Sequence, residues 1–494
     1  MATEAQTIWR HGRIYGLGSI LNRFASLLLI PVLLHTLTVE EWGVYALILL
    51  LGRLITIVPS AINDTMAPTF FDRDEDRDRH AVIATTLALY VFTAVTFLVL
   101  AYPGAIVLGD VLFQGQTYFL PLLLAITALV FEVLFEIELD YLRIRGRSGI
   151  FMAASLLRSL LHFGLSIFFV VVLTMGVTGV VLGQLISFAL LAVPTAIFVL
   201  REVGLGASRK IAGDMIRVGL PLVPAWFAKA SLELLERYLL SILASTATMG
   251  LYALASKLVD QLRPVLTMPF AVIWGVRLLE IGKMPERAAE FNRVFVYFMC
   301  ILSTAALGLA LFAPELIHLL SAEAFWGADI VVPILAIGYV TRVCYYHFEI
   351  GIIQSKRTAY LMWANWATLF VSALALYILI PAYGLIGAAA GEVISRSFRL
   401  AVTVWAAARC SNLVKLFPWG SLTVMMIWLI VCYLPAAWVT GNVVSVTNFA
   451  IKCAVMTIFV VLGFYSPILH ASERRQVYRA LAEQLGQLRA RLAR

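Results

Sequence analysis

Charged side chains interrupt several long apolar stretches of this sequence, and their spacing places them on shared helical faces. Residues three or four positions apart are neighbours on one face of an α-helix. The stripes formed in this way are Lys229, Glu233 and Arg237; Lys257, Asp260 and Arg263; and Glu392, Arg396 and Arg399. An ionisable group inside a membrane helix costs roughly 2.5 to 3.5 kcal/mol, so these stripes are expected to face protein or water and not lipid.

Basic residues outnumber acidic ones among the charges that we select as candidates for a cavity lining. Ten are basic and five are acidic: Arg23, Arg53, Arg158, Lys229, Arg237, Lys257, Arg263, Arg342, Arg396 and Arg399 against Glu233, Glu236, Asp260, Glu349 and Glu392. A cavity with this lining is cationic, and the planar donor fork of arginine matches phosphate well. We predict that a phosphate and its attached glycan bind Arg23, Arg53, Lys257, Arg263, Arg342, Arg396 and Arg399.

Pairing is the alternative explanation for many of these charges, because pairing also makes a charge tolerable in a membrane. The expected structural pairs are Lys229, Glu233 and Arg237; Glu392 with Arg396; Arg158 with His162; and interface pairs of Glu132, Glu136 and Asp140. Arg23 and Arg53 differ, since neither has an acidic residue within one helical turn of its own span. For these two arginines a ligand-binding role is favoured.

The sequence contains no recognisable motor or catalytic constellation. A phosphate-cradling loop needs Gly, four residues, then Gly-Lys-Ser/Thr, and residues 275–284 come closest without fitting. We therefore predict a transporter, not an enzyme, without a cofactor or metal, driven by an H⁺ or Na⁺ gradient, the membrane potential or its own substrate gradient. The candidates for ion coupling are Asp260, Glu392 and Glu236.

Composition requires a membrane protein. Hydrophobic residues make up 62% of the 494 residues and charged residues 13%, and the mean hydropathy is +0.92. A soluble protein carries about 25% charged residues. The formal net charge of +8 does not indicate nucleic-acid binding, because the basic residues lie inside the spans and in alternate connecting loops. The five cysteines have no paired spacing and are read as small apolar fillers.

Fourteen stretches are long enough to cross a bilayer, which takes about 20 residues each. They are 14–36, 42–66, 81–102, 117–138, 149–173, 177–200, 217–243, 247–274, 292–313, 329–352, 359–381, 384–408, 419–440 and 447–470. Lys and Arg are confined to every second loop, which predicts that both termini are cytoplasmic. The first stretch is too long for a cleavable signal and is expected to remain as a span. The expected fold is an all-α membrane protein of fourteen helices.

An internal repeat divides these spans into two halves. Residues 175–187 match residues 383–395 at an offset of 208, and residues 42–47 match 249–254 at an offset of 207. Six spans per half make the two lobes parallel, related by an axis along the membrane normal. The expected domains are an N-lobe (1–205), a C-lobe (206–410), two further helices (411–470) and an amphipathic cytoplasmic tail helix (471–494). At these offsets Arg53 falls opposite Asp260 and Gln184 opposite Glu392, which predicts phosphate nearer the first lobe and a coupling ion in the second.

Several segments resemble polysaccharide flippases of the multidrug/oligosaccharidyl-lipid/polysaccharide (MOP) exporter superfamily. They are Gly-Val-Tyr-Ala-Leu (43–47), Gly-Leu-Tyr-Ala-Leu (250–254), Arg-Ile-Arg-Gly-Arg-Ser (143–148), Gln-Ser-Lys-Arg-Thr (354–358) and Gly-Leu-Pro-Leu-Val-Pro (219–224). The resemblance implies that a polyprenyl-(pyro)phosphate-linked oligosaccharide is moved from the inner to the outer leaflet of a bacterial cytoplasmic membrane by alternating access. In relatives that flip the peptidoglycan precursor, arginines occupy places comparable to Arg23, Arg53 and Arg263. The chain has Glu236 before Arg237 where members often carry Asp.

Other functions fit part of the pattern. A cation-coupled multidrug exporter of the same fold would need an acidic and aromatic cleft for organic cations, whereas the charges here are mainly basic. A peptidoglycan-precursor flippase would share the arginines. A membrane polymerase or ligase would need a long external loop, and the longest here, residues 314–327, is short. The expected partners are therefore a lipid-linked oligosaccharide, membrane lipids and other polysaccharide-assembly proteins, but not nucleic acid.

Overall fold

The computed structural model describes residues 28–73, 75–113, 118–271, 274, 288–355, 357, 359–411, 414–441 and 443–465. Within these ranges the chain is helical and contains no strand, which confirms the all-α prediction. Arg23, the beginning of the first expected span and the expected tail helix (471–494) lie outside the described residues. The chain divides into unit 1, Met1–Ala253 with Leu320–Phe325, and unit 2, Leu254–Leu319 with Trp326–Arg494.

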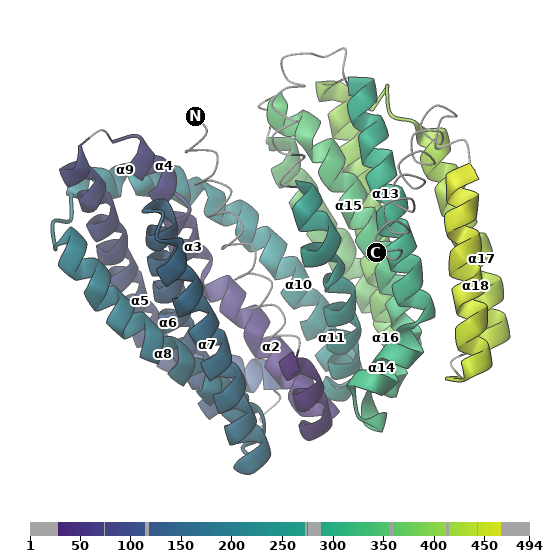
Figure 1. Cartoon of the computed structure of the whole chain (residues 1–494), viewed down its shortest axis with the longest axis horizontal. Helices are drawn as coiled ribbons and strands as arrows, with labels where there is room; N and C mark the ends of the chain where they lie inside the picture. Colours follow the sequence, from purple (N-terminus) through teal and green to yellow (C-terminus); the bar gives the residue numbers. More distant parts are fainter. Residues whose placement is uncertain are drawn as a thin grey trace, which may run out of the picture. The chain divides into compact units, whose positions relative to one another are not determined.

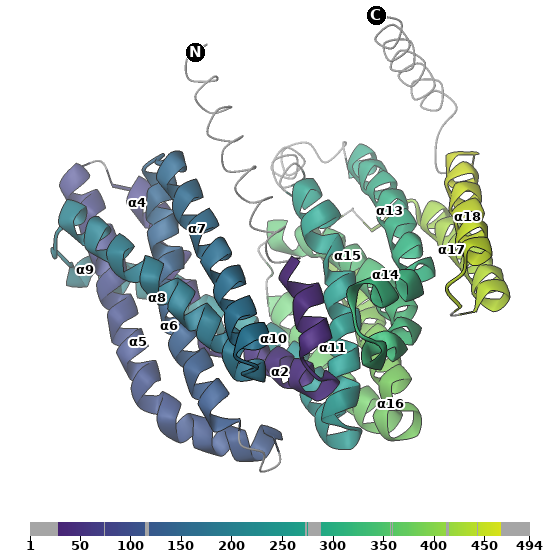
Figure 2. The ribbon, with the colours of Figure 1, turned by 60° about the horizontal axis from the view of Figure 1, so that its bottom comes forward.

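Unit 1 is a bundle of long helices. Its helices are α2 (Val39–Ile55), α3 (Ile57–Asn63), α4 (Met66–Phe71), α5 (Asp76–Phe113), α6 (Phe119–Ile144), α7 (Ser148–Ile167), α8 (Gly176–Val203), α9 (Arg209–Gly219) and α10 (Val223–Leu243), and α11 (Thr246–Asp260) begins in this unit. Helices α6 and α8 pack together, and α5 and α7 flank them (Figures 1 and 2). The core of unit 1 lies among α5, α6, α8 and α9, around Ile83, Tyr141 and Met215.

Unit 2 contains the end of α11 and the helices that follow it. These are α13 (Ala288–Leu311), α14 (Ala313–Leu320), α15 (Val332–Gln354), α16 (Ala359–Cys410), α17 (Trp419–Thr440) and α18 (Val446–Tyr465). A π-helical turn, Arg263–Thr267, continues the path of α11. Helices α15 and α16 pack against each other, and α17 and α18 form a pair beside α13 (Figure 1).

The described helices account for part of the expected number of membrane spans. Nine described helices are long and apolar enough to cross a membrane, and the bent α2 to α4 segment makes ten. Helix α16 holds two expected spans, because its backbone breaks at Gly384. Helices α10 and α11 coincide with expected spans but carry several charges. The total of fourteen spans stays a prediction.

Two expected loops are helical in the structure. Residues 103–113 extend α5 beyond Pro103, although the sequence suggested a loop from there on. Residues 314–327 include most of α14 and the start of a 3₁₀ segment, Glu323–Val331. Proline lacks one backbone donor but does not end a helix in every context.

The internal repeat appears in the backbone as paired glycines. Gly176 and Gly384, which are 208 residues apart, both adopt a left-handed φ, of 54° and 53°. Both halves therefore turn at equivalent positions before their sixth expected span, in a conformation that favours glycine. About two turns further on, Gly183 and Gly391 let this span pack closely against the preceding one. A Cβ on Gly183 would lie 2.8 Å from the Ser166 backbone nitrogen, and a Cβ on Gly391 would lie 2.8 Å from Cδ2 of Leu376. Small residues at such positions let membrane helices approach each other.

A second pair of repeat-related glycines meets within unit 1. A Cβ on Gly43 of α2 would lie 2.7 Å from the Thr246 carbonyl oxygen of α11, and a Cβ on Gly250 of α11 would collide with the Val39 carbonyl oxygen. The first turns of the two helices therefore touch through their backbones. This contact fixes the beginning of both helices that carry the exposed charges described below.

Candidate functional site

Arg53 is presented on α2 by a well-defined helix start. Thr38 caps α2 by accepting a hydrogen bond from the Glu41 backbone nitrogen (3.1 Å), and the Glu41 carboxylate accepts one from the Thr38 nitrogen (2.9 Å). This reciprocal capping box stabilises the helix N-terminus. Arg53 lies in the last turn of α2, with 68% of its side chain exposed.

Arg53 forms an ion pair with a distant part of the chain. Its Nη1 donates to Oε2 of Glu233 on α10 at 3.0 Å, and the Glu233 side chain is 36% exposed. The sequence-based expectation of a lone arginine is therefore wrong, because the partner is 180 residues away and no helical spacing shows it. Lys229 and Arg237 lie one turn to either side of Glu233 on the same helix. Pairing of Glu233 is thus observed, with Arg53 as its partner.

The acidic row on α6 contacts neighbouring helices of unit 1. Glu132 accepts a hydrogen bond from Gln184 of α8 at 3.0 Å, and its charge interacts with those of Arg158 and Arg53. Asp140 accepts bonds from Asn63 (2.9 Å) and Arg143 (2.7 Å). These contacts confirm the expected interface pairing for Asp140.

Arg158 is held by contacts other than a pair with His162. Its Nη2 donates to the Ser159 hydroxyl at 2.8 Å, and its guanidinium lies 5.0 Å from the centre of the Phe188 ring. His162 lies 3.4 Å from the Ser166 hydroxyl. Arg158 and His162 are both basic, and two positive charges repel each other, so they do not form an ion pair. The neighbouring acid Glu132 balances the Arg158 charge.

Unit 2 presents a charged stripe along the end of α11. Lys257, Asp260 and Arg263 are all exposed and follow one another at intervals of three. Asp260 accepts a hydrogen bond from Nη2 of Arg342 on α15 at 2.9 Å, and 50% of the Asp260 side chain remains exposed. The Arg342 guanidinium lies 4.6 Å from the centre of the Tyr339 ring. Arg263 begins the π-helical turn, and such turns frequently occur at functional sites.

Helix α16 carries two buried ion pairs in unit 2. Arg396 pairs with Glu392 four residues earlier, which confirms the pairing expected from their spacing. Arg399 donates to Glu349 of α15 at 2.6 Å and to Asn365, and only 8% of its side chain is exposed. An uncompensated charge at such depth is costly, so both arginines depend on their acids. Both were expected from sequence to bind substrate directly.

The predicted site residues therefore occupy three environments. Arg53, Lys257 and Arg263 are exposed, Arg342 is largely buried with its charge on Asp260, and Arg396 and Arg399 lie in buried pairs. Glu236 is buried in α10. Sequence reasoning missed Lys452 of α18, which pairs with Glu315 at 2.6 Å. Its signal was visible, because it is a basic residue in an apolar span.

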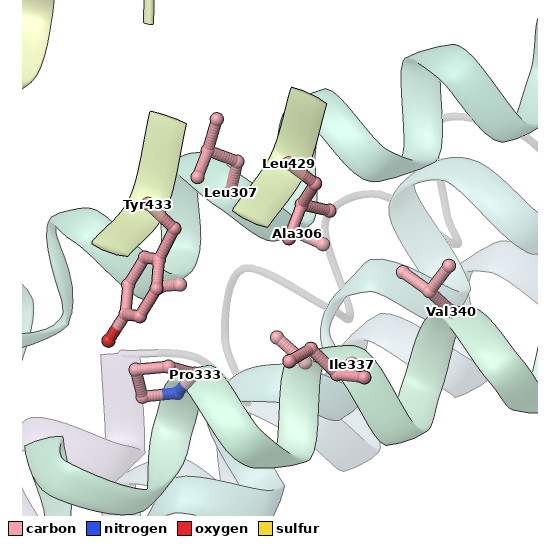
Figure 3. Close-up of a pocket in the computed structure, with 9 residues that line it drawn as sticks. Ala306, Leu307, Pro333, Ile337, Val340, Leu429 and Tyr433 are labelled. Atoms are coloured by element: carbon pink, nitrogen blue, oxygen red, sulfur yellow. The ribbon is translucent and has the colours of Figure 1, made fainter. Parts of the chain in front are cut away.

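An apolar groove lies in unit 2 between α13, α15 and α17 (Figure 3). The groove is small, with a free volume of about 20 Å³, and it is partly open to the surface. Its lining consists of Ala306, Leu307, Ala310, Pro333, Ala336, Ile337, Val340, Leu429 and Tyr433. Alanine on two facing helices keeps the groove open, and nearly all of its wall is hydrocarbon.

A family model for polysaccharide biosynthesis proteins matches residues 32–331, more than half of the chain. The chain belongs to this polysaccharide biosynthesis protein family. The predicted family is thereby confirmed, and its long apolar helices make the chain a multi-pass membrane protein. No curated protein matches the chain.

Solved structures agree with the MOP fold. A structure of the lipid II flippase MurJ, in an inward closed conformation, has a TM-score of 0.72 at 13% identity over 92% of this chain and 98% of that chain. An inward-facing multidrug resistance MATE transporter has a TM-score of 0.63 at 18% identity over 80% and 95%. An outward-facing MATE transporter has a TM-score of 0.55 at 17% identity over 83% and 96%. At these identities the likeness concerns the fold.

Proposed function

We propose that this protein moves a polyprenyl-(pyro)phosphate-linked oligosaccharide from the cytoplasmic to the outer leaflet by alternating access, for surface polysaccharide synthesis. The observation that carries the proposal is the exposure of Arg53, Lys257 and Arg263 within membrane helices. Exposed cations at such positions require a wet environment. A phosphate group is an anion that such exposed cations bind well.

The three parts of such a substrate have different requirements. Arg53, Lys257 and Arg263 offer direct contacts for the phosphates, and Arg23 remains a candidate outside the described residues. Arg342, Arg396 and Arg399 have acidic partners and would support this surface or join it when a pair opens. The apolar groove suits the polyprenyl chain. The glycan needs hydrogen-bonding groups, which the charged faces provide.

Energy for the cycle would come from an H⁺ or Na⁺ gradient, the membrane potential or the substrate gradient, without a cofactor. Asp260, Glu392 and Glu236 remain the candidates for ion coupling. Asp260 contacts Arg342, and Glu392 contacts Arg396. A proton or Na⁺ on either acid would therefore free one arginine for phosphate. We place the protein in a bacterial cytoplasmic membrane with both termini cytoplasmic, near other polysaccharide-assembly proteins.

Replacement of Arg53 tests this function. In a strain that depends on this protein for glycan export, Arg53→Ala should reduce export at least tenfold, whereas Arg53→Lys should retain part of it because a point charge remains. Arg77→Ala changes an exposed arginine near the start of α5 and serves as the control. Protein levels are compared by immunoblot. Full export by Arg53→Ala at normal abundance would remove Arg53 from the site.

One observation favours a second candidate. The α6 row of Glu132, Glu136 and Asp140 gives unit 1 acidic groups that an organic cation could use, as in a multidrug exporter. Expression in a drug-sensitive strain should then raise resistance to cationic dyes, and Glu136→Gln should abolish that resistance. A peptidoglycan-precursor flippase is the other alternative. It would restore growth to cells depleted of their own lipid II flippase.

A further inference from the structure

Lys452 is a buried lysine in the C-terminal helix pair, which has no counterpart in the internal repeat. Only 2% of its side chain is exposed, and its Nζ donates to Oε1 of Glu315 on α14 at 2.6 Å. Lysine is almost never fully buried unless it is paired. The contact joins α18 to the segment between α13 and α15, 137 residues earlier in the chain.

Further polar groups surround this pair. Asp329 is buried just before α15, and its carboxylate interacts with the charges of Lys452 and His318. The His318 ring stacks on Trp326 at a centroid distance of 3.8 Å. Tyr433 of α17, which lines the groove, interacts with the Asp329 charge. The ion pair therefore lies next to one end of the groove.

Helices α17 and α18 also contact α13, through apolar side chains. They involve Leu307 and Leu311 of α13, Leu429 and Cys432 of α17, and Phe459 of α18. Lipid chains are as apolar as these side chains, so burying them against protein instead of lipid gains little free energy. The buried ion pair does favour one position of the helix pair, because Lys452 facing hydrocarbon without a carboxylate is strongly disfavoured.

We propose that Lys452 is a positioning residue: its ion pair with Glu315 fixes α17 and α18 against α14 and so holds the α17 wall of the apolar groove in place. Leu429 and Tyr433 form that wall, and Pro333 and Ile337 of α15 lie across the groove from them (Figure 3). The role of the groove in holding a polyprenyl chain rests on the proposed function. The effect of the ion pair on the position of α17 does not rest on that function.

Electron-spin distance measurements on the full chain in lipid nanodiscs test the positioning. Nitroxide labels replace the exposed residues Ile301 on α13 and Trp438 on α17 in a cysteine-free background. The parent protein should give one narrow distance distribution. Lys452→Met should broaden it or add a longer distance, since Glu315 then lacks its partner. Lys415→Met, an exposed lysine before α17, should leave the distribution unchanged.

A charge exchange separates the ion pair from a general packing effect. The double variant Lys452→Glu with Glu315→Lys should restore the narrow distribution, although each single change widens it. Should Lys452→Met fail to accumulate in the membrane, the exchange variant and Lys452→Arg still decide the matter, because both keep a pair. An unchanged distribution in Lys452→Met, or an exchange variant as broad as the single variants, would overturn the proposal. An exchange variant that regains the narrow distribution but shows no glycan export would concern the proposed function alone.

Discussion

The charged residues of this protein belong to two groups with different energetic roles. The pair of Arg53 and Glu233 is exposed, so its net contribution to stability is small and either partner is available to a ligand. Arg399 and Glu349 are buried, and Nη2 of the arginine lies 2.6 Å from Oε1 of the glutamate. Each charge compensates the other, so neither is left unpaired in the interior. Exposure therefore separates residues suited to bind substrate from residues that hold the helices.

This difference predicts unequal effects on stability. Glu349→Ala leaves Arg399 buried without its carboxylate and should lower the free energy of unfolding by about 3–5 kcal/mol. Glu233→Ala should cost less than about 1 kcal/mol, because the pair is exposed. Denaturation in a mild detergent, followed by tryptophan fluorescence, measures both. Equal effects of the two substitutions would contradict this division.

At the level of helices, the repeat keeps the backbone and changes the charges. In each half, a charge on the second span interacts with an opposite charge on the fourth span. The positions of the acid and the base are exchanged between the halves. In unit 1 the Arg53 charge of α2 interacts with Glu132 of α6, whereas in unit 2 Asp260 of α11 pairs with Arg342 of α15. The glycines at which the sixth spans begin are retained in both halves. Geometry is thus common to the halves, and electrostatics is specific to each.

The glycine contacts predict a graded response to added methyl groups. Gly183→Ala should destabilise the protein by about 1–3 kcal/mol, because its Cβ would press on the Ser166 backbone. Gly391→Ala should cost less, since its Cβ would meet the movable end of Leu376. Gly164→Ala has open space around it and should be neutral or stabilising, because alanine favours helix. The same denaturation assay compares the three, and a reversed order of Gly183 and Gly391 would refute the packing argument.

Much of the fold could be predicted from sequence, and the partners of the charges could not. Periodic apolar stretches and the 208-residue repeat predicted a helical membrane protein, and spacing predicted the pair of Glu392 with Arg396 because both lie on one helix. The partners of Arg53 and Arg399 lie on other helices, where only tertiary structure places them. Lys452 was visible as a basic residue in an apolar span, but its partner Glu315 lies on another helix, where only tertiary structure places it.

At the scale of the whole molecule, two lobes of common design and different charge suit an amphiphile with a charged head, a glycan and a hydrocarbon tail. The exposed cations of α2 and α11, the buried pairs of α16 and the apolar groove of unit 2 are separate elements. Each fits one requirement of such a substrate. Loss of an exposed cation should therefore reduce transport without unfolding the protein, whereas loss of a buried pair should also destabilise it.

Flipping by the purified protein tests this account most directly. The full chain is reconstituted in liposomes with a fluorescent polyprenyl-pyrophosphate oligosaccharide, and a membrane-impermeant quencher measures how much probe reaches the other leaflet. Protein-containing vesicles should exchange the probe faster than empty vesicles, and Arg53→Ala with Lys257→Ala should remove most of the gain. Exchange no faster than in empty vesicles, under either an H⁺ or a Na⁺ gradient, would contradict the central claim.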